Sequence, residues 1–451
     1  MPKQRVAVRV LAFLVAGLGL LAWVNKAEAV PSFARQTGMS CMACHTMWPE
    51  LTPFGRTFKL TGYTISKSDK KYQFPPPLAG FVKFAFTHTN KAFPPGQAPN
   101  DFQANDNLAL PQETGIYYAG KIYGKLGTFT HGIYDGLEEK FHLDLTDIRL
   151  ANTGKIWGKP IIYGLSINNT PTVQDVWNST PAFGFPFSTS EIAPTPAAAT
   201  IIDNTLGQQV GGIGFYGYFN NLLYVGASFY HTTLNGYPVW LGLGTRPDMY
   251  VSGVAPYWRV YLQHQMGKHT FMLGHYGMLT NIFPEGMTRG NTNQFTDIAF
   301  DAQYQYISKK HKFSIEATWI HEIQDWSASF ALGNTASRFN NLDTARFNVN
   351  YAYWTDYGTF GGNFAYFNTF GGRDLVLYAP DPVDGSRNGL PNSDGFIIQA
   401  EYLPPIWDRR TKFVVQYTIY NTFNGAGSNY DGSGRSASDN NTLYVLVWQM
   451  F

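Results

Sequence analysis

The sequence has very little cysteine and little charge. Only two of its 451 residues are cysteine, which excludes a framework of structural disulfides. Charged residues make up 14% of the chain and the formal net charge is +2, too small a value to suggest binding to nucleic acid. The G-x-S-x-G, H-E-x-x-H and Walker motifs are also missing, so the common hydrolase and nucleotide-binding sites are not indicated. The two cysteines are therefore the main clue to any chemistry.

Both cysteines belong to one short motif, Cys41-Met42-Ala43-Cys44-His45. Covalent attachment of a c-type haem requires this pattern, because the two thiols add to the haem vinyl groups and the adjacent histidine becomes an axial iron ligand. The alternatives are a small disulfide loop or half of a zinc site, and no second pair of zinc ligands follows. The motif predicts one covalent haem c. Cys41, Cys44 and His45 would bind it, with His45 as the proximal iron ligand and the residue closest to the redox chemistry.

The N-terminus has the three parts of a secretory signal peptide. Lys3, Arg5 and Arg9 lead into an apolar run from residue 10 to residue 24, and Ala27-Glu28-Ala29 follows. We interpret residues 1–29 as a signal peptide that is cleaved after Ala29. A retained membrane anchor is the alternative, but the apolar run is short for a span of about 20 residues. Export is consistent with haem c, which is attached outside the cytoplasm in bacteria.

Residues 30–77 are predicted to form a monohaem cytochrome c segment. Fewer than fifty residues cannot readily enclose a haem and also build an independent core. The segment ends in the stiff sequence Pro75-Pro76-Pro77, which leads into the remainder of the chain. We therefore expect the haem segment to pack against residues 78–451.

Residues 78–451 alternate apolar and polar side chains with the period of a β-strand. In one clear example Phe300, Ala302 and Tyr304 alternate with Asp301 and Gln303. Aromatic residues reach 16% of the chain, as expected for the aromatic belts of a membrane barrel. A soluble β-sandwich or propeller is the alternative, since alternation does not reveal what the apolar face contacts. Strands are predicted near residues 81, 115, 127, 141, 160, 210, 222, 256, 269, 296, 311, 344, 357, 394, 410 and 442.

These segments predict an all-β fold, a 16-stranded antiparallel transmembrane β-barrel with the haem segment plugging its lumen. Short and long connections alternate along the chain; residues 220–221 form a short one and residues 169–209 a long one. In bacterial barrels short turns lie at the periplasmic end and long loops lie outside. The predicted location is therefore the bacterial outer membrane, with the haem segment entering from the periplasm and outer-membrane lipid around the barrel.

The sequence around the haem motif resembles a known family. FARQTG (residues 33–38) precedes the motif and PELTPFGRTFKLTGY (residues 49–63) follows it, while PTVQDVWN and FGFP occur in the long stretch at residues 171–178 and 183–186. With a signal peptide and a barrel ending in Phe451, this chain resembles the fused monohaem cytochrome c and porin proteins of bacterial outer membranes. The resemblance covers essentially the whole mature chain and is most specific over residues 31–63.

The resemblance implies an oxidoreductase that works in the outer membrane. It would oxidise extracellular Fe(II) through one haem c and pass the electron to a periplasmic carrier such as a soluble cytochrome c. Two alternatives remain open. One is a porin or solute channel in which the haem segment is a gate, and the other is electron uptake from a different extracellular donor.

Several side chains are candidates for supporting roles around the haem. Arg35, Arg56 and Lys59 are candidates to pair with the haem propionates, because guanidinium and ammonium groups bind carboxylates. A carbonyl of Pro49 or Pro53 is expected to accept a hydrogen bond from His45. The sixth iron ligand is unknown: Met39, Met42 and Met47 lie too near the attachment site, and the inward candidates are His142, Met272 and Met278. An open or water-bound sixth position is the alternative.

Two groups of charged residues are expected to act at a distance from the haem. Inward polar residues are expected to hold the haem segment, and the candidates are Arg259, Asp301, Gln303, Glu316, Arg346 and Glu401. Acidic residues in the external loops are expected to form a shallow electrostatic funnel for a ferrous ion. They are Asp135, Glu138, Glu139, Asp325, Asp374, Asp381 and Asp384, and the alternative is that they only solvate the loops.

Overall fold

A computed structural model describes residues 31–99, 105–180, 184–232 and 247–451. The predicted signal peptide, residues 1–29, lies outside the described residues. The helices and helical turns are α2 (Pro31–Thr37), α3 (Cys41–Cys44), α4 (Pro53–Leu60), η2 (Ile201–Thr205), η4 (Pro284–Gly286), α5 (Ser327–Leu332), η5 (Ile406–Arg409) and η6 (Ala437–Asn440). The strands are β1 (Leu78–Thr89), β2 (Asp106–Tyr123), β3 (Leu126–Asp135), β4 (Lys140–Ile156), β5 (Lys159–Asn168), β6 (Gly211–Phe219), β7 (Leu223–His231), β8 (Tyr250–Val251), β9 (Ala255–Met266), β10 (His269–Phe283), β11 (Asn293–Ile307), β12 (His311–Asp325), β13 (Phe339–Thr355), β14 (Gly358–Gly371), β15 (Ser393–Leu403), β16 (Thr411–Thr422) and β17 (Thr442–Met450).

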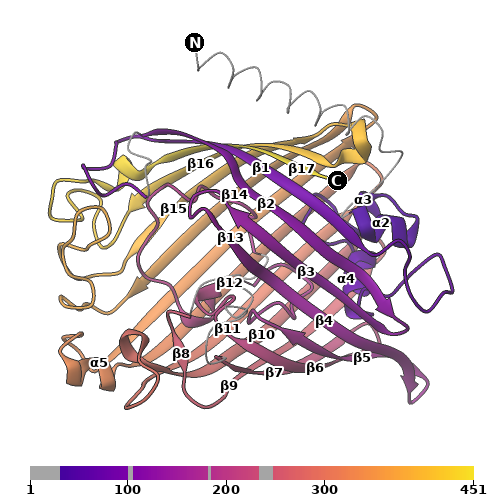
Figure 1. The fold of residues 1–451 in the computed structure, drawn as a ribbon, viewed down its shortest axis with the longest axis horizontal. Helices are drawn as coiled ribbons and strands as arrows, with labels where there is room; N and C mark the ends of the chain where they lie inside the picture. Colours follow the sequence, from indigo (N-terminus) through magenta and orange to yellow (C-terminus); the bar gives the residue numbers. More distant parts are fainter. Residues whose placement is uncertain (1–30, 100–104, 181–183, 233–246) are drawn as a thin grey trace, which may run out of the picture.

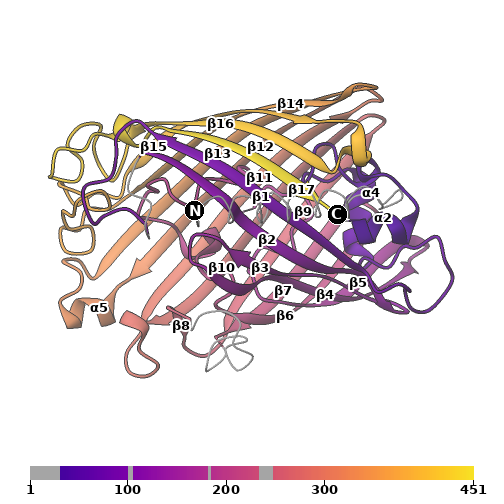
Figure 2. The same ribbon diagram turned by 45° about the horizontal axis from the view of Figure 1, so that its top comes forward.

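The strands form one closed antiparallel barrel (Figures 1 and 2). Each long strand pairs with its neighbours in the sequence, and β1 pairs with both β2 and β17, which closes the sheet. The sheet has seventeen strands in the described residues, but β8 is only a two-residue pairing beside the end of β10. The remaining sixteen strands build the wall and confirm the predicted fold class. Backbone hydrogen bonds between Gly80 and Phe451 complete the seam.

The alternation seen in the sequence separates the two faces of the barrel wall. Phe300 is 48% exposed on the outside, whereas the next residue, Asp301, is 2% exposed on the inside. An outward apolar band and an inward polar face are what a lipid-facing barrel requires. No helix among the described residues is long and apolar enough to cross a membrane. Outward apolar side chains elsewhere include Ile116, Leu150, Phe215, Leu273, Phe347 and Val415.

The two ends of the barrel differ in the lengths of their connections. One end has short turns, such as residues 124–125 and 267–268, and the other has long loops, such as residues 372–392. Helices α2, α3 and α4 and the C-terminus lie at the short-turn end, whereas α5 lies at the long-loop end (Figure 1). The protein is thus a bacterial outer-membrane barrel whose short turns and N-terminal helices face the periplasm and whose long loops are extracellular.

The N-terminal helices occupy the periplasmic mouth and bind inward residues around its circumference. The Tyr63 hydroxyl donates to Asp147 of β4 at 2.5 Å, and the Tyr216 hydroxyl of β6 donates to the Leu60 carbonyl at 2.6 Å. On the opposite side, Lys412 Nζ of β16 donates to the Trp48 carbonyl at 3.0 Å. Because these strands come from different parts of the wall, the segment is enclosed by the barrel, as predicted.

The long connection between β5 and β6 turns inward and fills the lumen beside this segment. Every residue from 168 to 180 is buried. Asp175 in this connection lies 3.0 Å from Arg259 of β9, and Arg259 also pairs with Asp301 of β11 at 2.7 Å. Asp203, farther along, pairs with Arg346 of β13. The expectation that these inward residues hold the haem segment was therefore wrong for Arg259, Asp301 and Arg346. They hold the inward loop, which carries no periodic pattern in the sequence.

A candidate haem c site

The C-x-x-C-H motif adopts a compact conformation fixed by the helix that follows it. Helix α3 contains both cysteines, and the Thr52 amide donates to the Cys44 carbonyl at 2.8 Å. Thr52 also caps α4, because its side chain accepts from the Gly55 amide at 3.2 Å. A side chain at Gly55 would place its Cβ 2.2 Å from the Cys44 carbonyl oxygen. The backbone of Gly55 therefore approaches Cys44 so closely that only glycine fits there.

His45 is held by two backbone carbonyls. Its Nδ1 lies 3.1 Å from the Pro49 carbonyl and 3.3 Å from the Glu50 carbonyl. A carbonyl can only accept, so Nδ1 carries the proton and Nε2 keeps its lone pair. Burial lowers the pKa of His45 to about 4, although the Pro49 and Glu50 hydrogen bonds oppose that shift. The neutral ring suits an iron ligand. The expected carbonyl partner is Pro49, and Pro53 does not contribute.

The two cysteines are not joined to each other; Cys41 is buried and Cys44 is half-buried. Cys41 is 1% exposed and its Sγ lies 3.2 Å from the Asp408 carbonyl of η5. Burial raises the pKa of Cys44 to about 12, so its thiol is protonated at neutral pH. No disulfide joins Cys41 to Cys44, in contrast to the disulfide-loop alternative.

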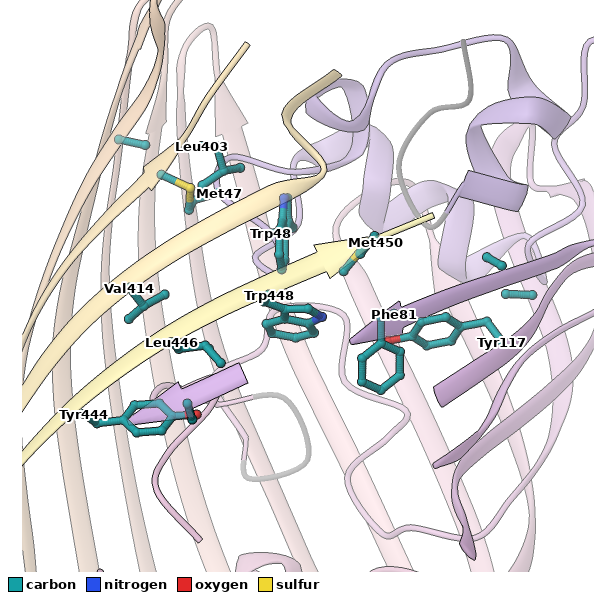
Figure 3. Packing of buried hydrophobic residues seen from close by; sticks show 14 residues of the cluster. Met47, Trp48, Phe81, Tyr117, Leu403, Val414, Tyr444, Leu446, Trp448 and Met450 are labelled. Atoms are coloured by element: carbon teal, nitrogen blue, oxygen red, sulfur yellow. The ribbon is translucent and has the colours of Figure 1, made fainter. Parts of the chain in front are cut away.

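A cavity of about 550 Å³ opens beside the motif and is lined by Cys41, Cys44 and His45. This size lies within the range of cofactor pockets, which is roughly 300 to 1,000 Å³. Trp48 from the N-terminal segment and Trp448 from β17 cross at a ring distance of 4.8 Å on one side (Figure 3). The cavity wall thus contains two thiols that can form thioether bonds, a histidine nitrogen that can bind iron, and aromatic side chains. The residues present fit a haem c. Other aromatic and apolar lining residues are Phe33, Phe58, Tyr63, Phe81, Tyr117, Phe129 and Met450.

The three basic candidates differ in their position around this cavity. Lys59 lines it, and its Nζ donates to the Asp175 carbonyl at 2.7 Å. Burial lowers the pKa of Lys59 to about 7. Arg56 does not line the cavity; it donates to Gln305 at 2.9 Å and stacks on a tryptophan of the inward loop. Arg35 donates to the Leu78 carbonyl. Arg410, a lining residue that the sequence did not single out, is placed there by the turn between β15 and β16.

The candidates for a sixth iron ligand are not brought to the cavity. Met272 packs in an apolar cluster with Leu60, and Met278 packs in another cluster with Ile202. His142 does not line the cavity either, whereas the neighbouring inward residue His131 of β3 does. The sequence pattern misses His131 because the residues that alternate with it on the same face, Phe129 and Ile133, are apolar and also line the cavity, so apolarity does not mark the lipid face in this strand.

Some of the acidic residues of the external loops accept hydrogen bonds that stabilise the loops. Asp374 is 2% exposed and accepts hydrogen bonds from the amides of residues 336, 337, 376 and 377. Asp135 accepts from the amides of residues 137 and 138. Exposed acids remain at Glu138, Glu139, Asp381 and Asp384. The expected funnel therefore loses Asp374, which is a loop-stabilising residue.

The comparisons with known proteins find solved structures of outer-membrane proteins. No protein-family model matches the chain, and no curated relative matches it. An anion-selective porin from Comamonas acidovorans is 13% identical with a TM-score of 0.47, covering 83% of this chain and 98% of that chain. Salmonella typhi OmpF in complex with daunomycin is 14% identical with a TM-score of 0.45, covering 83% and 97%. A loop-deletion mutant of OmpT from Vibrio cholerae is 8% identical with a TM-score of 0.43, covering 83% and 98%. The fused cytochrome and porin family stays a prediction.

Proposed function

We propose that this protein is an oxidoreductase that moves electrons across the outer membrane through one covalent haem c. An extracellular donor would supply the electron, and a periplasmic carrier such as a soluble cytochrome c would receive it. Fe(II) is the donor that the family resemblance suggests. The observation that carries the proposal is the position of Cys41, Cys44 and His45 on the wall of one aromatic-lined cavity at the periplasmic mouth.

The chain would attach the haem, fix its orientation and surround it with aromatic side chains. A bound haem c would contribute reversible one-electron chemistry at its iron. Cys41 and Cys44 would hold the macrocycle through thioether bonds, and His45 would present Nε2 because Pro49 fixes its Nδ1 proton. Lys59 and Arg410 line the cavity and are the basic side chains that we propose would bind the haem propionates. The aromatic lining would limit the solvent exposure of a bound haem, and solvent exposure is one of the factors that set a haem potential.

The filled lumen favours electron movement over solute movement. The inward loop and the N-terminal segment contact each other, since Lys59 donates to the Asp175 carbonyl and Asn178 Nδ2 donates to the Pro49 carbonyl at 3.1 Å. A solute would have to displace buried ion pairs to pass this layer, at a cost of several kcal/mol for each broken pair. An electron does not require that displacement.

The experiment that tests this proposal is haem analysis of the full-length protein produced in a host that matures c-type cytochromes. We expect one covalent haem for each chain and reversible reduction. Cys44→Ser and His45→Ala should lose normal haem loading, while the barrel keeps its heat-modifiable gel mobility. His264→Ala, at an exposed position on β9, is the matched control and should match the wild type. Absence of covalent haem from the wild type would refute the proposal.

The closed barrel itself favours a second candidate, a solute channel gated by the haem segment. A sixteen-strand barrel is wide enough for an aqueous interior when its lumen is empty. Conductance of the purified protein in planar bilayers separates the two candidates. Steady open-channel currents in the wild type would support the channel, whereas currents that appear only after removal of the N-terminal segment would support the filled lumen.

A further inference from the structure

His131 lines the same cavity as the proposed haem-attachment motif, but it belongs to the barrel wall and not to the N-terminal segment. It is on β3, which reaches the cavity from the barrel wall, whereas His45 belongs to the N-terminal segment. Its side chain is 11% exposed. Phe129 and Ile133, two residues before and after it on β3, also line the cavity, so the alternation of this strand points His131 inward. The register shift between β3 and β4 beside His131 places its extra residue on β4, in the stretch that contains Asp144.

One of the two nitrogens of this ring has no partner in the fold. Nδ1 is buried and has no hydrogen-bond partner. Nε2 lies 3.3 Å from a carboxylate oxygen of Asp144, which also lines the cavity. Most buried polar groups are satisfied, so an orphaned ring nitrogen beside a carboxylate requires an explanation. Histidines that bind metals commonly have this arrangement, with one nitrogen for the metal and a carboxylate close to the other.

Aromatic neighbours fix the orientation of the ring. The His131 ring centroid lies 4.9 Å from that of Tyr117, 5.6 Å from that of Phe129 and 6.3 Å from that of Phe81. Phe81 and Tyr117 stand next to each other beside the tryptophan pair at the barrel seam (Figure 3). A side chain packed in this way loses little additional entropy when it binds a ligand.

The other lining side chains that can bind iron are less suitable. Met39 lies two residues before Cys41 and is 41% exposed at the edge of the segment. Met450 belongs to the apolar cluster around Trp448. Lys83 also lines the cavity but is paired with Glu113. Among the histidine and methionine side chains of the lining other than His45, His131 is therefore the one that is buried and has a ring nitrogen without a partner.

We propose that His131 is the second axial ligand of the iron that His45 binds, giving a bis-histidine haem. This inference rests on the proposed haem attachment. It would also link the barrel wall to the N-terminal segment, because His131 and His45 would bind the same iron. This link would stabilise the segment in the periplasmic mouth in addition to its hydrogen bonds. A six-coordinate iron has no open position, which directs the site toward electron transfer and away from binding of small molecules.

The test is spectroscopy of the purified, haem-loaded protein. We expect the ferric wild type to be low-spin, without the near-infrared charge-transfer band of iron–methionine ligation, and the ferrous wild type to resist carbon monoxide. His131→Ala should keep its covalent haem, lose the low-spin spectrum and bind carbon monoxide, and added imidazole should restore the low-spin spectrum. His142→Ala, on the neighbouring strand and outside the cavity, is the control and should behave as the wild type.

Three results would overturn the assignment. They are an unchanged low-spin spectrum in haem-loaded His131→Ala, a high-spin wild type, and a methionine band in the wild type. If His131→Ala fails to fold, the more conservative His131→Gln and the wild-type near-infrared spectrum still decide the question. A wild type without covalent haem would instead refute the proposed function, so the two failures are distinguishable.

Discussion

Lys412 offers the sharpest test of how the N-terminal segment is docked in the barrel. Its Nζ pairs with Glu401 and also donates to the Trp48 carbonyl at 3.0 Å. The side chains of Lys412 and Glu401 are only 2% and 1% exposed. Lys412→Met keeps the apolar stem but removes the charge, so Glu401 loses its ion pair and the Trp48 carbonyl loses its donor.

The expected cost follows from the burial of this pair. Removing one partner of a buried ion pair costs about 3 to 5 kcal/mol. Glu401 retains amide donors from Asn363 at 3.0 Å and Gln399 at 3.3 Å, so the lower end of that range applies. A loss of about 3 kcal/mol corresponds to more than a hundredfold change in the unfolding equilibrium. Replacing both charges in Lys412→Met/Glu401→Gln should recover much of this loss, because a neutral pair leaves no uncompensated charge.

The assay is denaturant unfolding of the detergent-solubilised protein, followed by tryptophan fluorescence and by heat-modifiable gel mobility. Lys412→Met should lower the unfolding midpoint, and the double variant should lie above the single variant. Lys309→Met, at an exposed turn position, is the control for loss of a lysine charge. A single variant as stable as the wild type, or a double variant whose loss equals the sum of both single losses, would refute this account of the docking.

Three further outcomes are expected. Gly55→Ala should disturb haem attachment because its Cβ would lie 2.2 Å from a backbone oxygen of Cys44, whereas Gly217→Ala has nothing within 4 Å and should be silent; equal haem content in both would contradict this. Cleavage at a protease site inserted in the exposed stretch 67–72 should leave the haem peptide bound to the native barrel, and its release on size exclusion would show weak docking. At Asp374, burial raises the pKa but the backbone amides lower it further, so the net shift is downward. The stabilising effect of Asp374 is therefore present above the unfolded pKa and lost as the pH falls through the folded pKa. Asp374→Asn should increase proteolysis of the loop at pH 7 but not in strong acid. Equal proteolysis of variant and wild type at pH 7 would refute this role.

The regular parts of the fold were predictable because the sequence repeats a physical constraint. Alternation such as Phe300 against Asp301 recurs in each long strand, since every strand must present one face to lipid and one to the lumen. The haem attachment stays a prediction, and it rests on the spacing of Cys41, Cys44 and His45 that haem chemistry requires. The Pro49 carbonyl was anticipated because a ligating histidine needs a partner at its second nitrogen.

The contents of the lumen were not predictable in the same way. The inward course of residues 169–180 and 184–210 depends on pairs such as Asp175 with Arg259, which are far apart in the sequence. Arg259 and Asp301 were correctly assigned to the inner face, but their partner was misassigned because polarity alone does not identify what occupies the lumen. His131 was missed because the apolar residues Phe129 and Ile133 share its inward face, so apolarity does not mark the lipid face in β3.

The central claim is that an electron from outside the membrane reaches a haem held in the periplasmic mouth. The most direct measurement is stopped-flow absorbance of the oxidised protein oriented in proteoliposomes, with Fe(II) added only on the side of the long loops. The account predicts that the reduced-haem band appears within milliseconds to seconds in the wild type and in His264→Ala, and that this band is absent in Cys44→Ser. Reduction by dithionite but never by Fe(II) would contradict the assignment of Fe(II) as donor, and absence of any haem signal would contradict the account as a whole.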